Sequence, residues 1–206
     1  VIVLSAHLEE ELAMKKKSAL AVIFCILPQF LGATSSQYNF MLKGLKEVEA
    51  GLAEFDIPFF LLFGDPAEKI PQFIRSHEAG ALVSDFSPLR IKMHWQRSIA
   101  SEVNIPFYEV DGHNIIPCWQ ASAKQEWAAY SIRPKIHRLL AEYLVDFPLT
   151  KKHPFPWPEA VDNDWQIAER TIRVDHTPDV NWAQPGERAA KKHLDEFIDQ
   201  GLIRYD

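Results

Sequence analysis

The sequence predicts an α/β fold: a doubly wound parallel sheet of five strands, followed by an extended Pro-rich segment and a C-terminal helix. Short apolar runs rich in β-branched and aromatic residues alternate with segments whose apolar residues recur at helical spacing. Such strand–helix–strand repetition is typical of parallel strands joined by right-handed crossovers. From about residue 146 the alternation stops, and a dense series of X-Pro pairs argues against helix or central strand there.

Five apolar runs are the predicted strands. In chain order they are Val1–Leu4, Leu20–Leu27, Pro58–Phe63, Ala81–Ser84 and Pro106–Val110. The second is a nearly continuous apolar run that ends at Pro28, as expected of a strand covered on both faces. Thirteen residues separate Ser5 from Ala19, which is just enough for a crossover of roughly a dozen residues.

Helical patterns lie between and after these strands. The expected helices cover 7–17, 38–52, the two segments that begin at Asp65 and Ser87, 136–143 and 185–198. Asp65-Pro66 and Ser87-Pro88 each have the form of an N-cap followed by proline at the first helical position. Apolar residues from Tyr38 to Leu52 fall on one face of the second helix.

We expect three regions along the chain. An α/β domain covers 1–145, an extended Pro-rich linker covers 146–181, and a last region with an amphipathic helix covers 182–206. The linker is expected to pack along a surface through Phe155, Trp157 and Trp165.

Composition limits the partners and the compartment. The formal charge of −6 at pH 7 makes the surface acidic, so little direct contact with nucleic acid is expected. Cys25 and Cys118 stand in separate apolar contexts, which favours reduced, buried thiols of a cytoplasmic protein over a disulfide. No apolar run is long enough to cross a membrane, and the basic-then-apolar order of a signal peptide is missing.

The most unusual stretch is Asp111–Ser122. Its Asp111, His113 and Asn114 suggest a metal or catalytic site, but no second group of ligands occurs at metal spacing, and no metal is expected. A nucleophile pair of Cys118 with His113 is conceivable.

Against that pair, the residues on either side of Cys118 favour burial of the thiol over reactivity. We therefore expect a structural role for His113, Asn114, Cys118 and Trp119. Arg133 and Lys135 would bind backbone carbonyls or acidic groups. The alternative for both is a solvated charge.

A second group of candidates lies where the strands end. Asp85, Phe86 and Ser87 follow the fourth strand and enter a helix, at the edge where open α/β sheets bind ligands. The alternative for Ser87 is helix capping.

A planar aromatic ligand needs apolar faces and a few fixed polar groups. Leu27, Tyr38 and Met41 would supply the faces, and Gln37 would add polarity beside Asp85. The alternative for Tyr38 and Met41 is a place in the core.

Four motifs in combination resemble class II cyclobutane pyrimidine dimer photolyases. They are F-M-L-K-G-L at 40–45, S-D-F-S-P-L-R at 84–90, H-N-I-I-P-C-W at 113–119 and R-P-K at 133–135. The chain resembles the Rossmann-like N-terminal domain of that family from about Ala19 to Ile198. The resemblance implies that 182–206 is the first helix of a helical FAD-binding domain that is largely absent from these 206 residues, and that the chain holds no catalytic residue. It also implies that the interface with that domain includes His113, Asn114, Cys118, Trp119, Arg133 and Lys135. The chain departs from the family at Gly112, where relatives have Ala, at Trp127, where Tyr is common, and in a stretch missing after Ser5.

The resemblance implies a light-driven flavoprotein that repairs DNA. Excited reduced FAD in the helical domain would donate an electron to a pyrimidine dimer flipped out of the duplex, and the dimer would split. The N-terminal domain would hold an antenna chromophore, a deazaflavin or a folate, in the pocket described above. UV-damaged DNA would bind through the helical domain, so these 206 residues alone are expected to hold no flavin and to repair nothing.

Two alternatives remain open from the sequence. One is a light-sensing module of the cryptochrome type, or a stand-alone ligand-binding module, without repair activity. The other is a nucleotide-binding α/β protein, although neither the G-x-G-x-x-G fingerprint nor the P-loop pattern is present.

Overall fold

The computed structural model describes residues 17–146, 149–172 and 177–205. Four of the five predicted strands are confirmed: β1 (Val22–Ile26), β2 (Phe59–Phe63), β3 (Leu82–Asp85) and β4 (Phe107–Val110). The strand predicted at Val1–Leu4, and all but the last residue of the helix predicted at 7–17, lie outside the described residues.

The strands form two parallel pairs rather than one sheet. β1 pairs with β2, from Val22 opposite Phe59 to Ile26 opposite Phe63. β3 pairs with β4 in the same parallel sense. The predicted five-stranded sheet is therefore not seen among the described residues, because none of them joins β1 to β3.

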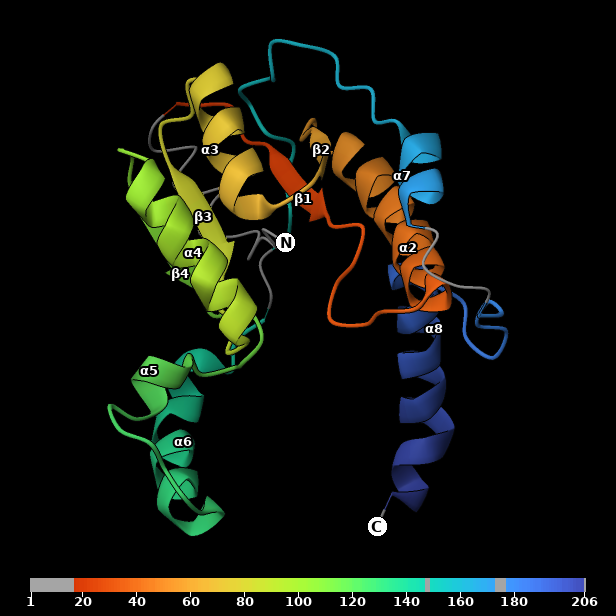
Figure 1. The fold of residues 1–206 in the computed structure, drawn as a ribbon. Helices are drawn as coiled ribbons and strands as arrows, with labels where there is room; N and C mark the ends of the chain where they lie inside the picture. The colour runs from red at the N-terminus through yellow and green to blue at the C-terminus, as the bar shows by residue number, and fades with distance from the viewer. Residues whose placement is uncertain (1–16, 147–148, 173–176, 206) are drawn as a thin grey trace.

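The described residues form seven α-helices, which carry the labels α2 to α8 in Figure 1. They are α2 (Ser35–Ala53), α3 (Pro66–Ser76), α4 (Arg90–Glu102), α5 (Cys118–Ala121), α6 (Ala129–Tyr143), α7 (Trp165–Thr171) and α8 (Glu187–Glu196). The last continues through a π-helical turn, η1 (Phe197–Gly201), and a 3-10 turn, η2 (Leu202–Arg204). No helix in the described ranges has both the length and the apolar character needed to cross a membrane.

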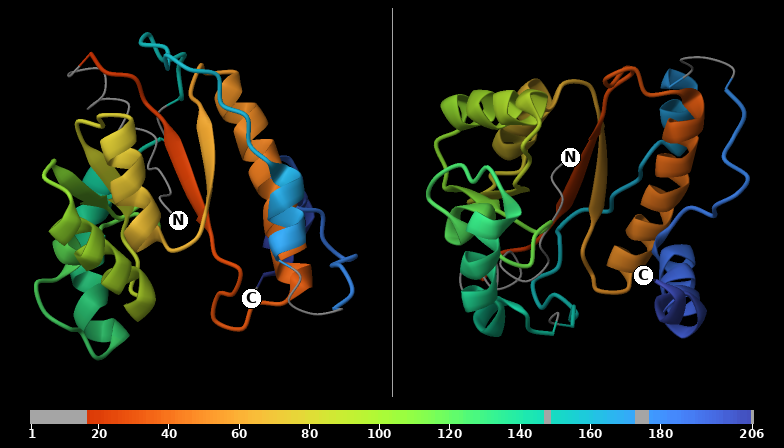
Figure 2. Two further views of the ribbon diagram at one scale, coloured as in Figure 1. Left: turned by 45° about the horizontal axis from the view of Figure 1, so that its top comes forward. Right: turned by 90° about the horizontal axis from the view of Figure 1, so that it is seen from below.

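Two apolar clusters lie on opposite faces of β1, whose five residues are all buried. Val22, Phe24 and Ile26 pack with β2, α2 and α7, whereas Ile23 and Cys25 pack with α3, β3 and α4. This alternation follows from the period of two along a strand. It confirms the expectation that β1 is covered on both sides (Figures 1 and 2).

The helix starts show which capping signals were correct. Asp65 caps α3, and its carboxylate accepts a hydrogen bond from Ala67 N at 2.9 Å with Pro66 in the first turn. Ser87 is not an N-cap: α4 begins three residues later, at Arg90, after Leu89. The Ser87 hydroxyl instead accepts a long bond of 3.4 Å from Leu89 N within the preceding turn.

The Pro-rich linker packs closely on the α/β core. Its Trp157 lies among Phe60, Phe73 and His77, with ring centroids 5.3 to 6.2 Å apart. Among the described residues, 149–164 hold no helix or strand, as expected of the linker, but the expectation is wrong at Trp165–Thr171, where α7 forms. No proline lies between Pro158 and Pro178, and Asp164 caps the new helix by accepting a bond from Ile167 N at 2.8 Å.

Candidate functional site

Asp111 organises the loop between β4 and α5. Its side chain is buried, with 6% of the residue exposed. Its carboxylate accepts hydrogen bonds from the backbone N–H groups of His113, Asn114 and Cys118, at 2.9 to 3.2 Å. The Asn114 side-chain amide donates to both carboxylate oxygens, at 2.9 and 3.0 Å. The polar cluster seen in the sequence is therefore a loop-fixing arrangement centred on Asp111.

The electrostatics of this loop argue against a nucleophile at Cys118. Burial would raise the pKa of Asp111, but the hydrogen bonds from Cys118 and Asn114 outweigh burial and lower it. Burial and a hydrogen bond to Asp111 raise the pKa of the Cys118 thiol. Cys118 as a whole residue is exposed, so its predicted burial is wrong and the burial that acts on its thiol is only partial, whereas Cys25 is buried as expected. A raised pKa leaves less thiolate at neutral pH, which supports the structural interpretation of Cys118.

A second polar cluster fixes the turn between α5 and α6. Lys135 Nζ donates to Ser122 Oγ at 2.9 Å and forms an ion pair with Glu126, whose side chain is 8% exposed. Ser122 Oγ donates to Glu126 at 2.8 Å. Lys135 thus bonds within its own hairpin, while Arg133 is exposed and forms no hydrogen bond or ion pair with another described residue. Arg133 remains a solvated charge in this structure.

The Glu126 cluster makes the α5–α6 hairpin sensitive to acid. Hydrogen bonds from Lys135 and from nearby serines lower the pKa of Glu126 from 4.5 to about 2. Because the folded-state pKa is lowered, the stabilisation is present above pH 4.5 and is lost as the pH falls towards 2. We expect Glu126→Gln to lower the melting temperature at pH 7, and the difference from the unsubstituted chain to shrink by pH 2.

Melting curves at several pH values test this expectation. Glu142→Gln, on the exposed surface of the same helix α6, serves as the matched control and should behave like the unsubstituted chain throughout. A difference between Glu126→Gln and the unsubstituted chain that stays constant from pH 7 to pH 2 would contradict the role assigned to Glu126.

Phe86 and Trp119 join the two groups of candidate residues. Their rings meet edge to face with centroids 5.5 Å apart, and Trp119 remains 44% exposed. The backbone N–H of Gly112 also donates to Asp85 at 3.3 Å. The end of β3 therefore contacts the Asp111 loop directly, so that Asp85 and Phe86 lie next to the predicted interdomain residues.

Asp85 is the last residue of β3 and is partly buried. Burial raises the pKa of Asp85, although His113, the Gly112 N–H and Lys92 pull it the other way. Burial likewise lowers the pKa of Lys92. Gln96 fixes the strand end by donating to Ser84 Oγ and to Asp85 O, both at 3.1 Å.

The candidates around β1 have structural roles. Tyr38 is buried, and its hydroxyl donates to Leu27 O at 2.9 Å. Gln37 closes a capping box with Thr34 at the start of α2, so its amide is already in use there. Met41 packs against the first core cluster. The structure thus brings Leu27 and Tyr38 together. Among the described residues, no hydrogen bond or ring contact joins either of them to Asp85, Phe86 or Ser87.

One aromatic contact that the sequence did not predict joins the β1–β2 pair to the β3–β4 pair near the carboxyl ends of their strands. Phe30, in the loop after β1, lies 6.0 Å from Trp95 of α4 between ring centroids. Both residues were visible in the sequence as parts of apolar patterns, but no local signal says which distant aromatic residues will meet. Phe30 and Trp95 therefore connect the loop after β1 with helix α4.

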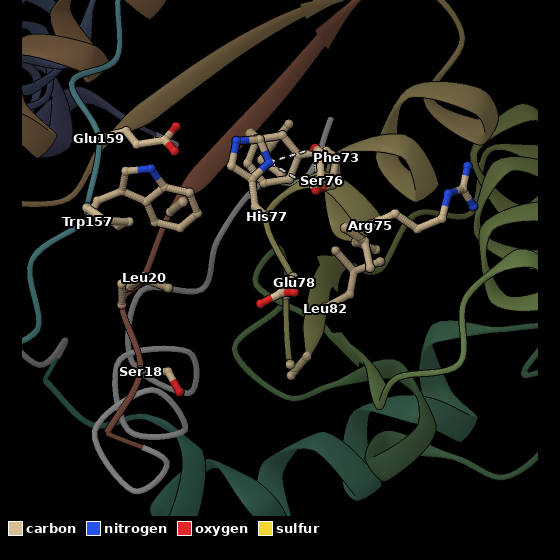
Figure 3. A pocket seen from close by; sticks show the side chains of 18 of the residues that line it. Ser18, Leu20, Phe73, Arg75, Ser76, His77, Glu78, Leu82, Trp157 and Glu159 are labelled. Atoms are coloured by element: carbon tan, nitrogen blue, oxygen red, sulfur yellow. Dashed lines mark hydrogen bonds between the residues drawn. The ribbon is translucent and has the colours of Figure 1, made fainter.

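A cavity of about 580 Å³ lies between β1 and β3 (Figure 3). Its wall includes Ile23 on one side, Leu82 and Val83 on the other, and Trp157 from the linker. Trp157 Nε1 is buried without a hydrogen-bond partner in the described ranges. No cluster of potential metal ligands is found among the residues that the structure describes.

Backbone groups of β1 and β3 that face this cavity have no hydrogen-bond partner among the described residues. Val22 N bonds to Pro58 O, and Gly64 N bonds to Ile26 O, so the even-numbered residues of β1 face β2. The N–H and C=O groups of Ile23 and Cys25 therefore point to the opposite side. In the same way, the even-numbered residues of β3 bond to β4, so the backbone N–H and C=O groups of Val83 and Asp85 point to the side of β3 that faces away from β4.

Comparisons with known proteins agree on one family. The DNA photolyase family model matches residues 8–159. A deoxyribodipyrimidine photo-lyase of Potorous tridactylus is 41% identical over 197 residues, which are 94% of this chain and 37% of that protein. One from Arabidopsis thaliana is 36% identical over 206 residues, 95% of this chain and 42% of that protein. The chain therefore spans about two fifths of the length of these curated relatives.

Solved structures show the same fold at lower identity. A cryptochrome of Synechocystis superposes with a TM-score of 0.73 at 15% identity, covering 95% of this chain and 44% of that one. An archaeal photolyase of Sulfolobus tokodaii, described with two FAD molecules, superposes at 0.62 with 12% identity, covering 87% and 40%. At such identities the likeness establishes the fold alone.

Proposed function

This chain belongs to the DNA photolyase family, and on that basis we propose that it is the N-terminal α/β part of a deoxyribodipyrimidine photo-lyase. The parent enzyme would use light to split cyclobutane pyrimidine dimers in DNA, with the electron supplied by reduced FAD. The single observation that carries the proposal is 41% identity to such an enzyme across 94% of the chain.

The proposal assigns the flavin and the DNA groove to a helical domain beyond these residues. The chain covers only 37% to 42% of its curated relatives, which leaves most of the relative's length for that domain. The acidic balance of the chain, −6 at pH 7, supports little direct DNA contact here. We propose that the parent lies in the cytoplasm, because the free cysteines Cys25 and Cys118 suit a reducing compartment.

A cryptochrome-like or ligand-binding role is less well supported. The cryptochrome likeness is a likeness of fold at 15% identity. The curated relatives quoted above, at 36% and 41%, are both named photo-lyases. No observation on the described residues favours sensing over repair.

We further propose that the two strand pairs belong to one five-stranded sheet. The predicted strand at Val1–Leu4 would lie between β1 and β3, where unused backbone groups face a cavity of about 580 Å³. The unpartnered Trp157 Nε1 at the same cavity supports an added carbonyl nearby. Slow amide exchange at Ile23 and Cys25 would support this arrangement, and fast exchange at both would rule it out.

An antenna chromophore, a deazaflavin or a folate, would sit at the carboxyl edge of that sheet. The candidate wall consists of Leu27, Gln37, Tyr38, Met41, Asp85, Phe86 and Ser87. Its support is that Leu27 follows β1 and that Asp85, Phe86 and Ser87 lie at the end of β3, the edge where open α/β sheets take ligands. Gln37, Tyr38 and Met41 come from helix α2. The buried hydroxyl of Tyr38 and the capping amide of Gln37 are engaged within the protein, so Asp85 and Phe86 are its strongest members.

The surface that would meet the helical domain is the Asp111 loop with the α5–α6 hairpin. It includes His113, Asn114, Cys118, Trp119, Arg133 and Lys135. The hairpin and α8 both extend from one side of the α/β body (Figure 1). The proposed regions are those expected from the sequence: the α/β domain at 1–145, the linker at 146–181 and the first helix of the helical domain at 182–206.

A chimaera tests the proposed function. Residues 1–206 are joined to the part of the Potorous relative that the match does not cover, and the chimaera is expressed in bacteria that lack photolyase. We expect visible light after UV irradiation to raise survival, as it does with the complete Potorous enzyme. The Potorous part alone is the negative control. A soluble, flavin-loaded chimaera without light-dependent survival would contradict the proposal.

A further inference from the structure

The outer edge of β2 presents backbone groups that a further strand could bind. Because the even-numbered residues of β2 bond to β1, the N–H and C=O groups of Phe59, Leu61 and Phe63 point away from it. An open edge of this kind is a template for pairing with another chain. On β2 the template consists of apolar residues throughout.

One side chain from the linker occupies this edge. Asn163 Oδ1 accepts a hydrogen bond from Leu61 N at 2.8 Å, and Asn163 Nδ2 donates to Phe59 O at 2.8 Å. A residue of an added parallel strand would use its own N–H and C=O in the same two bonds. The amide of Asn163 therefore imitates one residue of a neighbouring strand.

The neighbours of Asn163 hold its amide in place. Glu49 of α2 accepts from Asn163 Nδ2 through one oxygen and from Trp165 Nε1 through the other, the latter at 2.7 Å. The Trp165 ring is stacked on Phe59 with 3° between the planes. Farther along, Ala168 and Ile172 are buried in the core. The amide is thus held in place by Glu49 of α2 and by the start of α7.

We propose that Asn163 is an edge cap: its side-chain amide takes the place of an added strand on β2 and prevents a strand of a second copy of the chain from pairing there. Asparagine suits this role because its amide combines a donor and an acceptor. A carboxylate in the same place has no donor for Phe59 O and would face Glu49. The exposed carboxylates of Asp162 and Asp164 flank the cap and add charge that disfavours pairing.

Amide exchange and self-association of the 206-residue chain test the proposal. In the unsubstituted chain, Leu61 N–H should exchange at least about tenfold more slowly than Phe63 N–H, which points outward and has no hydrogen-bond partner among the described residues. Asn163→Ala and Asn163→Asp should each remove that protection. Sedimentation should then show average mass rising with concentration above that of the unsubstituted chain.

Asn39→Ala is the matched control. It removes another amide hydrogen bond between distant segments, from Asn39 Nδ2 to Asp179 at 2.7 Å, on the surface of α2. It should leave both Leu61 exchange and mass unchanged. Equal exchange of Leu61 and Phe63 in the unsubstituted chain would overturn the proposal even if a variant fails to fold. Folded variants with a protected Leu61, or with unchanged mass, would also overturn it.

Discussion

Replacing Asp111 with alanine is expected to lower the free energy of unfolding by about 3 to 5 kcal/mol and to release the loop between β4 and α5. The buried carboxylate accepts bonds from three backbone N–H groups and from the Asn114 amide. Alanine leaves these donors without their partner, and hydrogen bonds to a charged group are worth more than neutral ones. Urea unfolding gives the change in stability, and amide exchange over 111–122 reports the loop.

Two further variants make the Asp111 result interpretable. Asp111→Asn keeps the shape and one acceptor oxygen, so its loss should be intermediate. Asp56→Asn removes an exposed ion pair with Lys152, whose atoms are 3.2 Å apart, and should cost below about 1 kcal/mol. If Asp111→Ala proved no more damaging than Asp56→Asn, the loop would not depend on the carboxylate.

Removing the ring of Trp165 is expected to detach α7 from the core and to cost about 3 kcal/mol. Three contacts are lost together: stacking on Phe59, the Nε1 bond to Glu49, and the Lys46 ammonium 5.6 Å from the ring centre. Trp165→Phe keeps the ring contact and loses the bond to Glu49, so about 1 kcal/mol is expected.

The control for this series is Trp182→Ala. Trp182 is 84% exposed, and its removal should change stability little. Denaturant unfolding of the three variants, with proteolysis of the linker as a second readout, checks the order. Equal stability of Trp165→Ala and Trp182→Ala would show that the linker lies on the domain without stabilising it.

The sequence predicted those parts of the fold that local patterns determine. Continuous apolar runs identified β1 and β2, and the Asp65-Pro66 pair located the start of α3. Ser87-Pro88 has the same form, yet Leu89 precedes the helix there. The difference is tertiary: Phe86 N donates to Val110 O of β4 at 2.7 Å, so the chain keeps its extended course past the end of β3.

The candidate site was predicted less completely, because its contacts join distant segments. The residue types of the Asp111 loop were singled out correctly, but the sequence did not show that Asp111 is the acceptor for the others. Asn163 gave no signal at all, since an asparagine in a loop is common and its partners on β2 lie 102 and 104 positions away. Pairing at that range depends on how the linker crosses the sheet.

The central claim is that this chain supplies a scaffold and that the photochemistry belongs to another part of its parent. The purified 206-residue chain is mixed with reduced FAD and a dimer-containing oligonucleotide, and the recovery of intact pyrimidines under blue light is measured. We predict recovery no greater than with reduced FAD alone, whereas the complete Potorous enzyme restores the bases. Light-dependent restoration by the chain, above that flavin background, would contradict the claim.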